Sequence, residues 1–180
     1  MRLHRCVLLP ALLGFSAALL AEPALTTRIQ QFDVLGNTPD TIGASLNRDR
    51  QHSASRVDWH FTWESTPGQC RLASANTEVS VTSHMPRLLP DATRPASVQQ
   101  QWDSYLLALQ AHQDGHVELA LDYARQIEQA LLALPPQTSC EQLSQSVNAV
   151  GQRLLSAMGS ADREYDKRTQ HGALEGATFP

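Results

Sequence analysis

The residues of this sequence best suited to chemistry are two histidines, His112 and His116, in the stretch QAHQDGHVELA (residues 110–120). A spacing of four residues puts both imidazoles on one side of an α-helix, where they can bind one metal ion. In the zinc-peptidase motif with this spacing, a glutamate follows the first histidine and acts as general base. Here that position holds Gln113, whose amide is not basic. The stretch therefore raises three hypotheses: a hydrolase, a metal site without hydrolysis, or two histidines without a metal.

The helix that must carry these histidines has apolar residues at helical spacing over residues 98–134. At about 100° per residue, His112, His116 and Gln113 fall inside this apolar stripe. Asp114 points away from it. Polar groups in a buried stripe need partners, and a shared cation would satisfy both imidazoles at once. The spacing alone favours a simpler interpretation, in which the two histidines are core or cleft residues bonded to backbone or carboxylates.

A glycine, Gly115, lies in this helix between the two histidines. Glycine inside a helix is less favourable than alanine by about 1 kcal/mol, so something should need the space. We therefore expect another segment to approach closely over the histidine pair.

A catalytic zinc site needs a third protein ligand. If the chain turns back at about residue 137, His171 would lie roughly 16 Å too far along a straight second helix, at about 1.5 Å per residue. Either that helix breaks near Gly159 and the chain folds back, or the third ligand lies nearer Asp162. The candidates are His60, His84, His171, Asp162, Glu164 and Asp166.

The composition predicts one folded domain. Of the 180 residues, 42% are hydrophobic and 18% are charged, which is sufficient for a packed core. The net charge is −4, and the sequence has no basic stripe with interleaved aromatic residues. Nucleic acid is therefore a poor candidate partner.

Residues 1–21 have the pattern of a signal peptide, with Arg2 and Arg5 before the apolar stretch CVLLPALLGFSAALLA. That stretch is shorter than the roughly 20 apolar residues of a membrane span, and Pro10 interrupts it. We predict a periplasmic or secreted protein whose mature domain, residues 22–180, has no membrane span once the signal is removed. An uncleaved N-terminal anchor is the alternative.

Two cysteines, Cys70 and Cys140, remain after signal removal. An even pair in an exported protein predicts a disulfide. Two free buried thiols, or a cysteine ligand to the metal, are the alternatives.

The chain divides into a β-rich part, residues 27–86, and a helical part, residues 97–170. We expect strands over 27–35, 56–64 and 70–83, with an irregularity near 73–77, and a short helix over 39–47. A Ser97–Gln100 capping box predicts the start of the first long helix, which Pro135-Pro136 ends. A second box, Ser139–Gln142, predicts the next helix. The fold class predicted is α+β, with a small antiparallel sheet and a short helix followed by two long helices.

One strand face, formed by Val57, Trp59, Phe61 and Trp63, is apolar in strict alternation with polar neighbours. We interpret it as core; a binding platform is the alternative interpretation.

Nearly the whole mature chain resembles a bacterial family of predicted secreted zinc-dependent proteases. The similar segments are FDVLGNTPDTIGASLN, VDWHFTW, SHMP, WDSYLLALQAHQDGHVELA and YDKRTQHGALEGA, together with the two cysteines. The resemblance implies a zincin-like fold, a peptide or protein substrate or partner, and Zn²⁺ bound by His112, His116 and His171. It also implies that Tyr165, Asp166 and Thr169 support the metal ligands or contact the substrate.

Gln113 departs from the family pattern, which has His-Glu-x-Gly-His at this helix. An amide cannot take a proton from water, so we expect peptide hydrolysis to be weak or absent unless Glu164, Asp166 or Glu118 replaces the base. A non-catalytic periplasmic binding or interaction protein, with a structural metal or none, is the competing hypothesis. A closed four-ligand site would support it.

Overall fold

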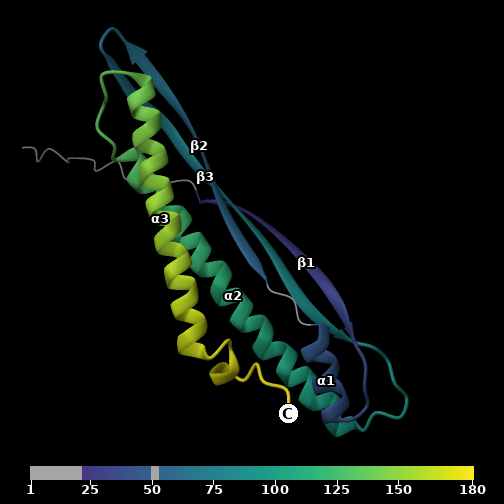
Figure 1. The fold of residues 1–180 in the computed structure, drawn as a ribbon. Coiled ribbons are helices and arrows are strands. Elements are labelled where there is room, and N and C mark those ends of the chain that lie inside the picture. The colour runs from purple at the N-terminus through teal and green to yellow at the C-terminus, as the bar shows by residue number, and fades with distance from the viewer. Residues whose placement is uncertain (1–21, 50–52) are drawn as a thin grey trace, which may run out of the picture.

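The computed structural model describes residues 22–49 and 53–180, so the predicted signal peptide lies outside the described residues. The elements are, in order, β1 (Ala24–Val34), α1 (Pro39–Asp49), β2 (Ala54–Thr66), β3 (Gln69–Leu88), α2 (Ala96–Leu132), α3 (Cys140–Thr169) and the short 3₁₀-helix η1 (Ala173–Glu175). Figure 1 shows an elongated molecule in which α2 and α3 run beside a twisted three-stranded sheet, with the C-terminus next to α1. The predicted α+β class is confirmed.

The sheet is mixed, so the prediction of a purely antiparallel sheet is wrong. Its strand order is β1-β3-β2, with β2 and β3 antiparallel and β1 and β3 parallel. The tight turn at Pro67-Gly68, where Gly68 has φ +76°, reverses β3 relative to β2. Because β2 already runs opposite to β1, the central strand β3 runs in the direction of β1. The β2–β3 register shifts at Thr62/Trp63, opposite Ser74/Leu72, which confirms the predicted irregularity.

Two of the three predicted helix starts are confirmed. Thr38 precedes Pro39, and its Oγ1 accepts a hydrogen bond from Thr41 N at 3.3 Å. Ser139 caps α3 and its side chain accepts from Gln142 N at 3.2 Å. The capping box at Ser97 is wrong, because α2 already begins at Ala96 with Pro95 as its cap residue. The Pro95 carbonyl accepts hydrogen bonds from Val98 N and Gln99 N, which puts Ser97 inside the first turn.

A disulfide joins Cys70, at the start of β3, to Cys140, the first residue of α3, which confirms that prediction. Two backbone hydrogen bonds of 2.8 Å between Cys70 and Gln137 reinforce the same junction. The connection between the two long helices is therefore fixed to the β2–β3 hairpin.

The interior contains two hydrophobic clusters. The sheet–helix cluster packs β2 and β3 against the C-terminal half of α2 and against α3. Its buried members are Val57, Val79, Val81, Ala120, Ala124, Ile127, Leu131 and Val147. The α1 cluster packs α1 against the end of β1 and the first turns of α2. Its buried members are Val34, Ile42, Leu46, Val98, Trp102 and Tyr105.

The apolar face of β2 enters the core over three of its four predicted residues. Val57 is buried, and Trp59 and Phe61 pack against the sheet–helix cluster. Trp63 is 48% exposed, so its assignment to the core is wrong. The Trp59 ring lies directly over Gly151 of α3, where a Cβ would lie 2.5–2.7 Å from ring atoms.

Helix α3 runs without interruption from Cys140 to Thr169, so the alternative of a break at Gly159 is wrong. Neither α2 nor α3, nor any other helix within residues 22–49 and 53–180, is both long and apolar enough to cross a membrane.

Candidate metal centre

The two histidines of α2 point their Nε2 atoms at one another and at a carboxylate of α3. The distance from His112 Nε2 to His116 Nε2 is 3.2 Å. Asp166 Oδ1 lies 3.3 Å from His112 Nε2 and 3.2 Å from His116 Nε2. His112 is only 3% exposed and His116 only 14%. These three residues form the group able to hold a metal ion among the described residues.

The spacing of these three atoms is short enough for one small metal ion to contact all three. With metal–ligand distances of about 2.0–2.1 Å, the edges of a tetrahedron measure about 3.3 Å. The edges of an octahedron with distances of about 2.1 Å measure about 3.0 Å. The observed separations of 3.2, 3.2 and 3.3 Å lie between these two values, so either geometry is compatible with the three atoms.

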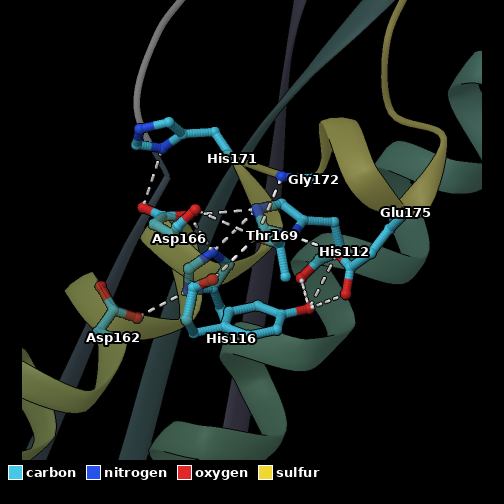
Figure 2. Close-up of polar contacts among 9 residues, drawn as sticks. His112, His116, Asp162, Asp166, Thr169, His171, Gly172 and Glu175 are labelled. Carbon is cyan, nitrogen blue, oxygen red and sulfur yellow. Dashed lines mark hydrogen bonds and ion pairs between the residues drawn. The ribbon is translucent and has the colours of Figure 1, made fainter.

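Each histidine is held from behind by a second carboxylate (Figure 2). His112 Nδ1 lies 2.8 Å from Glu175 Oε2, and His116 Nδ1 lies 2.7 Å from Asp162 Oδ1. A proton on each Nδ1 satisfies these carboxylates and leaves each Nε2 with a free lone pair. Ligating histidines in metalloproteins carry carboxylate partners of this kind, which fix both the tautomer and the ring orientation.

Gly115 makes room for Tyr165, as its position in the helix led us to expect. A Cβ at Gly115 would overlap the Tyr165 hydroxyl and lie 2.7 Å from Tyr165 Cζ. The Tyr165 ring stacks on His112, with ring centroids 5.1 Å apart, and its hydroxyl donates to Glu175 Oε1 at 3.2 Å. Burial, followed by the Glu175 carboxylate, raises the pKa of Tyr165, so this hydroxyl keeps its proton at neutral pH.

A sharp reversal after α3 brings Glu175 back to His112. Gln170, His171 and Gly172 all have positive φ, at 52°, 54° and 82°. The buried Thr169 fixes this turn, because its Oγ1 donates to Tyr165 O at 2.9 Å and accepts from Gly172 N at 3.2 Å. A Cβ at Gly172 would lie 2.9 Å from His112 Cγ. Glycine is therefore needed there both for the positive φ and for the close approach to His112.

His171 lies on the far side of Asp166 from the two helix histidines (Figure 2). Its Nδ1 is 3.3 Å from Asp166 Oδ2, and its side chain is 77% exposed. The structure thus brings Asp166 to the position for which the resemblance named His171. Ligation by His171 stays a prediction that a metal-bound sample must test.

Gln113 lines a cleft of about 510 Å³ beside the histidine pair. Asp162 and Asp166 also line it, but both already contact histidines. Glu118 and Glu164, which we considered as substitutes for the missing base, are exposed and do not line the cleft.

The sequence alone does not predict the roles that Asp162 and Glu175 have in the site. Asp162 was considered only as a third ligand, whereas it supports His116. Glu175 was not considered, although it follows the Gly172 turn within the HGALEGA segment. The sequence signal for this role is the position of Glu175 between Gly172 and Gly176, directly after the helix.

The fold and the site together define an α+β protein with a His-His-Asp candidate metal centre in a cleft between its sheet and its helices. Residues 29–172 match the family described as "Bacterial protein of unknown function (DUF922)", and the chain belongs to this family. A search of curated proteins found no match, and a search of solved structures found none.

Proposed function

We propose that this protein binds one zinc ion through His112, His116 and Asp166. We further propose that it is a zincin-like relative of the zinc peptidases whose peptide hydrolysis is weak or absent. The observation that supports the zinc site best is the convergence of two Nε2 atoms and one carboxylate oxygen, a donor set that zinc accepts. Two histidines and one carboxylate also suit iron(II), so the metal analysis below must separate the two ions.

When bound at such a site, zinc polarises a substrate carbonyl and makes a coordinated water more acidic. The protein's own residues decide whether this leads to hydrolysis. Gln113, which lines the cleft, can hydrogen-bond a water or a peptide carbonyl but cannot accept a proton. Asp162 supports His116, and Asp166 is committed to the two Nε2 atoms, so neither replaces the base.

The second candidate function is a non-catalytic binding protein that uses the cleft without cleaving its ligand. Gln113 favours this function, because it removes the proton acceptor and keeps the hydrogen-bonding capacity. Three protein ligands beside a cleft are typical of a zinc site with an open position, which favours the peptidase layout.

We propose that the protein acts outside the cytoplasm, in the periplasm or after secretion. The supporting observations are the signal-like pattern of residues 1–21 and the Cys70–Cys140 disulfide, a bond that persists in oxidising compartments.

The first experiment measures the metal content of the mature protein, purified without a histidine tag. We expect about one zinc per chain, lost in a His112→Ala/His116→Ala double variant and kept in a His60→Ala control on exposed β2. Asp166→Asn and His171→Gln then identify the third ligand by X-ray absorption, which distinguishes two imidazole ligands from three. If the wild type takes up no zinc on reconstitution, the proposed function is wrong.

Hydrolysis is tested with Gln113→Glu in a zinc-loaded sample incubated with a mixed peptide library. Gain of cleavage that a chelator abolishes would support a peptidase site lacking only its base. Zinc binding with no cleavage by either protein would leave the binding function.

A further inference from the structure

The cleft beside the metal centre also carries information about the ligand that it accepts. Along α2 its lining extends from Tyr105 to Ala120, a length of about 22 Å at 1.5 Å per residue. The two histidines lie near the middle of this span. An extended polypeptide rises about 3.3 Å per residue, so the cleft matches about six or seven residues.

Apolar walls lie on both sides of the histidine pair. Towards α1, the lining comes from residues of the α1 cluster and its partly buried neighbours: Phe32, Leu46, Tyr105 and Leu109. Towards the C-terminal half of α2, it comes from the sheet–helix cluster and its neighbours: Val81, Ala120 and Met158. The metal centre therefore lies where the two hydrophobic clusters meet. The partly buried Phe32, Leu109 and Met158 supply the accessible apolar surface on either side of it.

The charged side chains of the cleft do not favour a ligand with a free carboxylate. Asp162 and Asp166 contribute carboxylates, and none of the described residues that line the cleft is Lys or Arg. Recognition of a free carboxylate normally uses a guanidinium or ammonium group. A C-terminal carboxylate would therefore find no Lys or Arg partner among the described residues that line the cleft.

We propose that the cleft takes an internal, extended polypeptide segment with apolar side chains on both sides of the residue that faces the metal centre. This inference rests on the proposed function, since it names the ligand class of the same site. The apolar walls belong to the protein itself, so the preference for apolar side chains exists with or without zinc.

The test uses four synthetic peptides six residues long. The first is N-acetylated and C-amidated, with two leucines on each side of a central Gly-Gly. The second and third replace the leucines with serine or with aspartate, and the fourth is the leucine peptide with a free C-terminal carboxylate. Dissociation constants are measured by calorimetry for the full mature protein, with zinc and with chelator, and the peptides are checked afterwards for cleavage.

We expect the blocked leucine peptide to bind at least about tenfold more tightly than the serine peptide, because apolar contacts discriminate to about this extent. We expect the free carboxylate to give no gain. Equal binding of the leucine and serine peptides, or tighter binding of the free-carboxylate peptide, would overturn the inference. If the protein prefers the leucine peptide but takes up no zinc, the proposed zinc function is wrong and the inference about the apolar ligand still holds.

Two leucines of α2 provide a matched pair of variants. Leu109 lines the cleft, whereas Leu107, two residues away, is 74% exposed and outside it. Leu109→Ala should weaken the leucine peptide by about tenfold, and Leu107→Ala should not change its affinity. Because Leu109 also packs on the α1 cluster, thermal unfolding of each variant is measured first, and Met158→Ala tests the opposite wall. Unchanged peptide affinity in both folded cleft variants would contradict the assignment.

Discussion

Replacing Gly115 with alanine gives a stability change whose sign distinguishes local helix propensity from packing around the candidate metal centre. Propensity alone predicts that Gly115→Ala stabilises α2 by about 1 kcal/mol. The structure predicts the opposite, because the new Cβ would overlap the Tyr165 hydroxyl and crowd its ring. Overpacking of this kind costs about 1–3 kcal/mol. Displacement of Tyr165 also loses its hydrogen bond to Glu175, a contribution of about 1 kcal/mol.

The sum is a net destabilisation of about 1–3 kcal/mol, which in a domain of this size lowers Tm by about 2–4 °C per kcal/mol. Differential scanning calorimetry of the metal-free protein measures it. Gly159→Ala is the matched control, since its Cβ would meet only Arg163 Nη1, at 3.6 Å, and should stabilise α3 by about 1 kcal/mol.

A double-mutant cycle provides the decisive comparison. In a Tyr165→Ala background the overlap is gone, so Gly115→Ala should change sign and become stabilising by up to about 1 kcal/mol. If alanine at this position raises Tm in the wild-type background, or shows no coupling to Tyr165, the packing of Tyr165 over the histidine pair is wrong.

Three further predictions concern the surroundings of the site. Glu175→Gln weakens the support of His112, so zinc affinity should fall by about 10–100-fold in a competition assay while the far-UV spectrum stays unchanged. Reduction of the Cys70–Cys140 disulfide, with its sequence separation of 70, should cost about 4 kcal/mol in a urea titration, and a change below 1 kcal/mol would contradict the chain-entropy argument. Folding raises the pKa of Tyr165, so the folded chain holds this proton more tightly than the unfolded chain. Its contribution to stability is therefore complete below the unfolded pKa of about 10 and is lost as pH rises through the folded value. Metal-free wild type should lose stability at alkaline pH more steeply than Tyr165→Phe, and parallel curves would refute this.

The sequence was informative where the structure is set by local geometry. Helical periodicity was sufficient to place His112, His116 and Gln113 on the inner side of α2 and Asp114 on its outer side. The cost of a glycine inside a helix was sufficient to predict a close neighbour at Gly115. The identity of that neighbour, Tyr165, depends on how α3 docks on α2, which periodicity does not determine.

The sequence was uninformative where distant segments meet. The parallel pairing of β1 with β3 depends on which strand becomes central, and strand patterns do not encode this. Glu175 reaches His112 only because three consecutive residues, 170–172, adopt positive φ, and two of them are not glycine. The same reversal places His171 against the outer oxygen of Asp166, so Asp166 lies between His171 and the histidine pair.

Helix α3 is attached differently at its two ends. Its first residue is bonded covalently to β3, and its buried apolar residues, Leu143 and Val147, lie in the first two turns after that bond. The carboxylates of the site lie near the other end of this helix, which is about 45 Å long for its 30 residues. Loss of the contacts around Asp166 should therefore loosen the last turns of α3 first, because Leu154, Leu155 and Met158 still hold the middle of the helix on the sheet–helix cluster. Amide exchange along α3 should then rise with distance from Cys140, so occupancy of the centre would be readable as a gradient of backbone protection.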